Sequence, residues 1–161
     1  MSASLEQRLK KLEDIEQIRM LRYWYAHHAN IIDGPGDLDA FSQLFTETGE
    51  WDVGLGHCIG PKAIKTAMQG VTTQWINALH LMINPMITVD GDTGTGTWTG
   101  LFPFISKANP RPIWGSLNYH DLYVRTDKGW KFQSVKITPI FQPPEFAEIY
   151  AGFISESPAT N

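Results

Sequence analysis

Cysteine is nearly absent from this sequence of 161 residues, in which Cys58 is the single example. An internal disulfide is therefore excluded, and such a composition is typical of a reducing compartment. No apolar run approaches the roughly 20 residues that a membrane-spanning helix needs. The first eleven residues carry too much charge for a signal peptide. We therefore expect a cytoplasmic protein that does not bind a membrane.

An excess of basic residues is also lacking. The chain has 13 Lys and Arg against 17 Asp and Glu, a net charge of −4, which argues against nucleic acid as the main partner. The motifs that hold zinc, dinucleotides or nucleoside triphosphates do not occur, nor does a Gly-x-Ser-x-Gly elbow. His27 and His28 would point about 100° apart on a helix, and His57-Cys58 has no second pair. We expect neither a metal nor a cofactor.

Aromatic residues, in contrast, are plentiful, with 6 Trp, 8 Phe and 5 Tyr. Such side chains build cores and interfaces, and they line pockets for apolar or aromatic ligands. The length suits one domain, which we place at residues 1–154, followed by a polar tail at 155–161.

The stretch from residue 78 to residue 90 organises the chain. Residue types alternate along it, which predicts a strand, and Pro85 predicts a bulge after Asn84. One face is hydrocarbon, whereas the other carries His80 and Asn84 among methionines. A buried imidazole or carboxamide needs a hydrogen-bond partner or a function, so we expect this face to line a site.

Helical patterns dominate the first part of the chain. Ser4 and Gln7 have capping-box spacing, and an amphipathic helix is expected to run towards Ile32 and to stop at the breaker cluster 33–36. Asp37 is expected to cap a second helix, followed by a turn at 46–49, a short strand at 51–55, a helix opened by Gly60-Pro61 and a connector at 70–75. The apolar stripe of the first helix contains Leu5, Leu9, Leu12, Ile15, Ile18, Leu21 and Tyr25.

Strand patterns dominate the second part. Asp90-Gly91-Asp92 predicts a hairpin, and the next strand has glycines at 94, 96 and 100 on one face, which leave room for a bend, a backbone or a ligand. Strands are expected at 113–125 and 130–140, and an apolar helix after Pro143-Pro144. Because helices come first and strands later, the order predicts an α+β fold with helices on one face of a curved sheet.

Several short strings resemble the SnoaL-like branch of the nuclear transport factor 2-like superfamily, and together they span residues 15–141. The resemblance implies a cone-shaped, curved antiparallel sheet that encloses a pocket with its helices. The strings are Ile18-x-x-Leu21-x-x-x-Tyr25, Asp37-Leu-Asp-Ala-Phe-x-x-Leu-Phe45, Trp51-Asp-Val53, Gly60-x-x-Ala63-Ile64, His80-x-x-x-Asn84, Val89-Asp-Gly-Asp92, Tyr119-x-Asp121, and Val124-Arg125 followed by Gly129-Trp130-Lys-Phe132.

Within that branch the chain is similar to scytalone dehydratase, bile-acid 7α-dehydratase and hexachlorocyclohexane dehydrochlorinase. The resemblance implies that His80 is a catalytic base and that Asp33 orients it. The segment after Tyr25 is longer than in those families, and Asn30 is the alternative partner by its spacing from Tyr25. A histidine buried in the core and a turn aspartate are the structural alternatives for His80 and Asp33.

Other polar side chains are candidates for holding a substrate or a leaving group. Phenol hydroxyls, a carboxamide and a guanidinium suit this role, because they donate hydrogen bonds to oxygen or to a departing anion. The candidates are Tyr25, Asn84, Tyr119, Tyr123 and Arg125. For Arg125, a solvated position beside a hairpin is the structural alternative.

The resulting hypothesis is a cofactor-free lyase, of dehydratase or dehydrohalogenase type, acting on a small cyclic or aromatic apolar molecule. An isomerase or polyketide-type cyclase would use the same base. A non-catalytic binding protein, or a subunit like the small subunit of aromatic-ring dioxygenases, is the alternative from another functional class. The resemblance also implies a homodimer or homotrimer.

Overall fold

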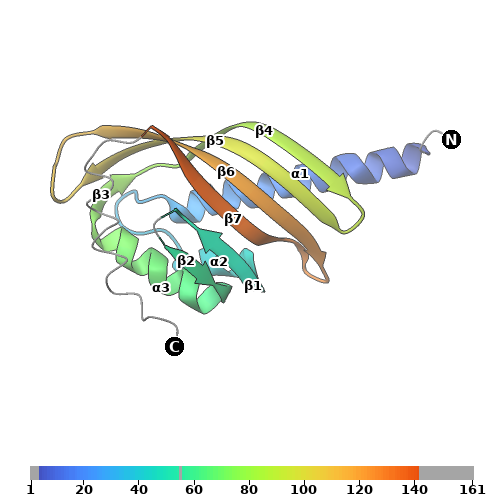
Figure 1. Ribbon diagram of the computed structural model, residues 1–161, viewed down its shortest axis with the longest axis horizontal. Helices are drawn as coiled ribbons and strands as arrows, with labels where there is room; N and C mark the ends of the chain where they lie inside the picture. Colours follow the sequence, from blue (N-terminus) through green and yellow to red (C-terminus); the bar gives the residue numbers. More distant parts are fainter. Residues whose placement is uncertain (1–3, 55, 142–161) are drawn as a thin grey trace.

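The structure, a computed structural model, describes residues 4–54 and 56–141 (Figure 1). Its helices and strands follow the predicted order of helices first and strands later. In chain order they are α1 (Leu5–Ala29), α2 (Leu38–Gln43), β1 (Phe45–Asp52), β2 (His57–Ile59), α3 (Gly60–Thr73), β3 (Trp75–Ala78), β4 (Leu81–Asp90), β5 (Thr93–Ser106), β6 (Ile113–Thr126) and β7 (Gly129–Phe141).

The seven strands form one curved sheet in the order β2-β1-β7-β6-β5-β3. All pairs are antiparallel except β1 with β7. β4 also pairs with β5, so β3 and β4 lie one after the other along the same neighbour. The sheet curves around the helices, which lie on its inner side (Figure 1). The predicted α+β fold with helices on one face of a curved sheet is therefore confirmed.

Local signals in the sequence set several element boundaries as expected. The capping box of Ser4 and Gln7 begins α1, and the Asp37 carboxylate accepts the Ala40 amide N–H at 2.9 Å to cap α2. Pro61 lies in the first turn of α3. Gly91, with a φ of 57°, makes the hairpin between β4 and β5. Each of these signals depends on residues only a few positions apart, so it can be predicted from the sequence.

Other boundaries differ from the prediction. Residues 46–49 are not a separate turn but lie within β1, in an irregular stretch between Phe45 and Glu50, where the register of pairing with β7 shifts. The segment 70–75 is not a connector, since α3 continues to Thr73 and β3 begins at Trp75. The expected C-terminal helix and the polar tail lie outside the described residues.

The apolar stripe of α1 is buried only in its second half. Leu5, Leu9 and Leu12 are 77%, 55% and 64% exposed, because the first turns of α1 extend beyond the sheet (Figure 1). From Ile18 onward the stripe packs inside the sheet. No described helix is long and apolar enough to cross a bilayer.

The inward glycines of β5 make room for two tyrosine rings of β6. A Cβ on Gly96 would lie 2.9 Å from the Tyr123 ring, and one on Gly100 would lie 2.6 Å from the Tyr119 ring. The space predicted at these glycines is therefore filled by side chains of the neighbouring strand. This packing places both tyrosines, which are almost fully buried, in the core under the sheet.

Candidate active site

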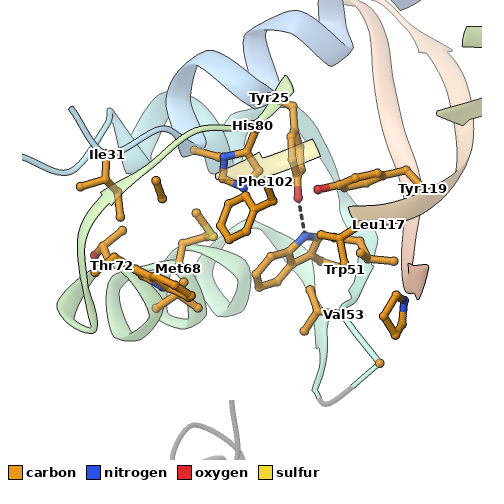
Figure 2. A pocket seen from close by; sticks show the side chains of 17 residues that line it. Tyr25, Ile31, Trp51, Val53, Met68, Thr72, His80, Phe102, Leu117 and Tyr119 are labelled. Carbon is orange, nitrogen blue, oxygen red and sulfur yellow. Dashed lines mark hydrogen bonds between the residues drawn. The ribbon is translucent and has the colours of Figure 1, made fainter. Parts of the chain in front are cut away.

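A cavity of about 120 Å³ lies between the sheet and helices α1 and α3 (Figure 2). Its wall is mostly aliphatic and aromatic, with contributions from Trp51, Met68, Trp75 and Phe102. For scale, an apolar cavity of about 150 Å³ holds one benzene molecule. The cavity therefore suits a single small ring. The polar side chains in its wall are Tyr25, Thr72, His80 and Tyr119.

His80 lies in the break between β3 and β4, where the predicted single strand over 78–90 is interrupted. The Oδ1 atom of Asn30 accepts the backbone N–H of His80 at 2.7 Å and lies 3.3 Å from the His80 Nδ1 atom. Backbone hydrogen bonds between Ile31 and Ala78, of 2.8 and 3.1 Å, hold the two segments together. The residue that follows α1 is thereby fixed beside the imidazole.

This arrangement determines the tautomer of His80. The backbone N–H is a donor, so the Asn30 atom that faces it is the amide oxygen, which only accepts. The ring atom Nδ1 then carries the proton and donates to Asn30. The other ring nitrogen, Nε2, then has a lone pair that no described residue binds, and it is the atom able to accept a proton or a hydrogen bond.

His80 is neutral at physiological pH. Burial of the ring, together with the positive charge of Arg22, lowers the pKa of His80 from 6.5 to about 3. Among the described residues no carboxylate opposes this effect, and the side chain at Nδ1 is an amide. The imidazole is therefore a hydrogen-bond acceptor and a weak base.

Tyr25 faces His80 from α1, with 6.4 Å between the ring centres. The indole N–H of Trp51 donates to the Tyr25 hydroxyl oxygen at 2.9 Å (Figure 2). Burial raises the pKa of Tyr25 to about 12 even though the Arg22 charge opposes it. The phenol therefore stays protonated, and its O–H is a donor that the Trp51 contact does not use.

Behind Tyr25 lies a buried ion pair that the sequence analysis missed. Arg22 donates from Nε to Asp121 Oδ2 at 3.1 Å and from Nη2 to Asp121 Oδ1, and both side chains are fully buried. The Tyr123 hydroxyl donates to Asp121 at 2.5 Å, and the Trp98 indole N–H donates to Tyr123 at 3.1 Å. The available signal was Arg22 itself, one helical turn before the stripe residue Tyr25.

Asp33 does not hold the His80 ring. Asp33 is exposed in the turn after α1 with a φ of 56°, whereas Asn30, the alternative partner, makes the contact. The helix ends at Ala29 with Asn30 as its C-cap, earlier than expected, and this ending directs Asn30 to β3. The expectation that a carboxylate from this segment orients His80 is therefore wrong for Asp33, whose position is that of a turn residue.

Of the other residues predicted to bind a substrate, some lie at the cavity and some do not. Tyr119 lines the cavity, and Tyr123 lies behind it in the ion-pair network. Asn84 is exposed at the predicted bulge, where the register of β4 shifts, so its side chain is on the outer face. Arg125 binds Asp14 at 2.7 Å and Asp92 at 2.8 Å near the β6–β7 hairpin, far from the cavity wall.

Metal ligands are not gathered anywhere in the part of the chain that the structure describes. No group of three or more His, Cys, Asp or Glu side chains among these residues has a geometry that would hold an ion.

Three solved structures illustrate what the fold is similar to. A candidate aromatic ring hydroxylase from Novosphingobium aromaticivorans is 25% identical, with a TM-score of 0.72 over 81% of this chain and 91% of that one. A candidate scytalone dehydratase from the same species is 19% identical, with a TM-score of 0.70 over 82% and 87%. A hexachlorocyclohexane dehydrochlorinase from Novosphingobium barchaimii is also 19% identical, with a TM-score of 0.69 over 85% and 91%.

A comparison with curated proteins finds no match. The model of the SnoaL-like domain, in contrast, matches residues 10–136, which include most of the helices and of the sheet and most of the residues that line the cavity. Its fold is similar to that of a nuclear transport factor 2-like protein with a cystatin-like fold, and the chain belongs to the SnoaL-like domain family.

Proposed function

We propose that this protein is a cofactor-free lyase that acts on a small cyclic substrate, with His80 as the base. One observation carries the proposal: the lone pair of a neutral imidazole and the hydroxyl of Tyr25 meet in one apolar cavity. An acceptor and a donor in such a position match a substrate whose carbon loses a proton while a neighbouring oxygen gains charge.

In the proposed reaction each of these groups has one role. Nε2 of His80 takes the proton from a carbon next to a carbonyl group. The electrons of the broken C–H bond form a C=C bond, and a hydroxide or halide leaves the next carbon with its bonding pair. Tyr25 donates to the carbonyl oxygen as it gains negative charge, and Asn30 holds the Nδ1–H of the imidazolium.

The low basicity of His80 narrows the substrate class. A base works best when its pKa is near the working pH, and that of His80 is about 3. A base this weak requires a C–H bond that a carbonyl group already acidifies. A six-membered cyclic ketone with a leaving group at its β carbon meets this requirement and suits the size of the cavity.

The names of two structural relatives agree with elimination chemistry, since one is a dehydrochlorinase and the other a candidate dehydratase. At 19% identity these likenesses show the fold, so the proposal rests on the cavity itself. Its test is therefore made on this chain.

The experiment uses 3-hydroxycyclohexanone, whose dehydration gives an enone that absorbs in the ultraviolet. We expect the wild type to form the enone, and His80→Gln to lose activity by about 10²- to 10⁴-fold, as for removal of a general base. Tyr25→Phe should also be slow. Arg19→Gln, an exposed change on α1, is the matched control. A folded His80→Gln protein with full activity would refute the role of His80.

A lyase and an isomerase or cyclase would use the same base, so the two are separated by comparing enone formation with hydrogen–deuterium exchange on a cyclic ketone. In D₂O, an enzyme that abstracts a proton from carbon introduces deuterium next to the carbonyl of cyclohexanone, which has no leaving group. Exchange without enone formation would favour the isomerase or cyclase.

A binding protein is the second candidate, and a specific observation favours it. The side chain at Nδ1 of His80 is the amide of Asn30, which does not stabilise an imidazolium as a carboxylate does. A wild-type protein that binds cyclohexanone, seen as a change in tryptophan fluorescence, but gives neither exchange nor enone would be a binding module.

Self-association in the cytoplasm is the remaining part of the proposal. Leu5, Leu9 and Leu12 form an exposed apolar row at the start of α1, a feature that is typical of an interface. Sedimentation velocity of the wild type and of Leu9→Glu measures the oligomeric state of each protein. Dimers or trimers that dissociate in the variant are expected, and a monomeric wild type would refute it.

A further inference from the structure

Arg22 is bound on one side only. Its guanidinium is fully buried, and the two nitrogens that face Asp121 both donate to that carboxylate. The third nitrogen, Nη1, has no hydrogen-bond partner among the described residues. A buried guanidinium with an unused donor is costly, so its position calls for an explanation beyond packing.

The guanidinium lies directly behind the polar wall of the cavity. Its carbon atom Cζ is 4.3 Å from the ring centre of Tyr25 and 4.8 Å from that of Tyr119. Both rings line the cavity, and their hydroxyl ends point toward one another beside Trp51 (Figure 2). The positive charge is thus separated from the cavity by the thickness of a tyrosine ring.

The negative end of the ion pair is turned away from the cavity. Asp121 is bound by Tyr123, which is bound in turn by Trp98, and none of these three residues lines the cavity. The electrostatics agree with this orientation. After burial, the positive charge of Arg22 lowers the pKa of His80, and at Tyr25 the charge of Arg22 has a larger effect on the pKa than the opposing charge of Asp121. The ion pair is therefore a dipole whose cationic end faces the cavity.

The described residues that line the cavity carry no formal charge that would cancel this field, since His80 is neutral and Tyr25 is protonated. The low-dielectric wall also screens the charge weakly. A ligand that places negative charge on an oxygen beside the Tyr25 hydroxyl would be favoured over a neutral ligand of the same shape.

We propose that the cavity selects ligands with a single ring and an anionic oxygen, phenolates or enolates, and that Arg22 is the positioning residue for this selection. Arg22 acts through Tyr25, whose hydroxyl donates to the oxygen and whose ring lies against the guanidinium. This inference rests on the proposed function for its substrate class, but the preference is a property of binding and requires no turnover.

The probe is 4-nitrophenol, because its ionised form absorbs at a longer wavelength than the neutral phenol. We expect the pKa of the bound probe to be lower than that of the free probe by about one unit, which is a tenfold preference for the phenolate. Nitrobenzene has the same ring and lacks the hydroxyl, so its binding measures the contribution of shape alone.

The test variant is Arg22→Gln with Asp121→Asn, which replaces the ion pair by a neutral, hydrogen-bonding pair of similar size. Circular dichroism and thermal unfolding establish that it folds. We expect it to lose the roughly tenfold preference while nitrobenzene binding changes little. Arg19→Gln, the matched exposed change on the same helix, should keep the preference.

Three results would overturn the inference: a bound probe that is neutral, a preference that survives in the folded double variant, and no binding of 4-nitrophenol to the wild type. The outcome is separate from that of the proposed lyase. Phenolate selection without enone formation would uphold the inference and refute the lyase, and enone formation with a neutral bound probe would do the reverse.

Discussion

The side-chain oxygen of Asn30 accepts the backbone N–H of His80 at 2.7 Å and lies 3.3 Å from the same residue's Nδ1. This pair joins the end of α1 to the break between β3 and β4, which are 50 residues apart in the chain. It fixes the tautomer of the imidazole, and it leaves the ring without a carboxylate. Both consequences can be tested.

Replacing Asn30 with Asp should raise the pKa of His80. A carboxylate keeps the same acceptor for the backbone N–H and adds a negative charge beside the ring, which favours the imidazolium by about one pKa unit or more. NMR titration of the His80 imidazole protons measures this pKa. The rate at which the protein exchanges the protons next to the carbonyl of cyclohexanone should increase as the pKa rises. Asn30→Ser, which adds no charge, is the control, and an unchanged pKa in Asn30→Asp would contradict this account.

His80 should make the protein less stable in mild acid. Its pKa is about 3 in the folded state and 6.5 ordinarily, so between these values the unfolded chain binds more protons. The stability that this neutral ring contributes is complete above about pH 6.5 and is lost as the pH falls toward 3. The slope is at most about 1.4 kcal/mol per pH unit.

Urea unfolding from pH 7 to pH 4, in the wild type and in His80→Gln, isolates this effect from other groups. The difference between the two free energies of unfolding should change with pH in the stated direction. A constant difference would mean that the pKa of His80 is the same in both states.

Loss of Asp121 alone should be severe. Asp121→Ala leaves the fully buried Arg22 charge unpaired and removes the acceptor of Tyr123, which costs about 3–5 kcal/mol. Denaturant unfolding measures the loss, and the neutral double variant of Arg22 and Asp121 should recover most of it. Glu16→Ala, which breaks the exposed pair with Arg19, should cost only about 0–1 kcal/mol.

Adding a methyl group under the sheet should move Tyr119. A Cβ on Gly100 would lie 2.6 Å from the Tyr119 ring, so Gly100→Ala is expected to destabilise by about 1–3 kcal/mol and to weaken ligand binding at the cavity. Gly115→Ala on β6 is the control, because its nearest neighbour would be 3.8 Å away. Thermal unfolding of both variants compares them, and equal melting temperatures would show that the ring is free to shift.

The features of the fold that depend on neighbouring residues could be predicted from the sequence alone. Ser4 and Asp37 cap helices through contacts three residues away, and the hairpin at Gly91 depends on one glycine conformation. The bulge after Asn84 was predicted because proline cannot donate to a sheet. The turn predicted at 46–49 was wrong for the opposite reason, since β1 is a strand through its pairing with β7 at Phe45 and from Glu50 onward, more than eighty residues later in the chain.

In the candidate site, too, some features could be predicted from the sequence and others depend on contacts between distant residues. The sequence by itself determined that a phenol lies on an inward face, because Tyr25 follows the period of α1. It also identified His80 as a cavity residue, although His80 lies in a break between two strands and not on the predicted continuous one. Only the tertiary structure decided that Asn30 rather than Asp33 meets His80, and that Arg22 pairs with Asp121, 99 residues away. Periodicity reports which way a side chain faces along its own element, whereas the identity of its partner depends on how two distant elements are brought together.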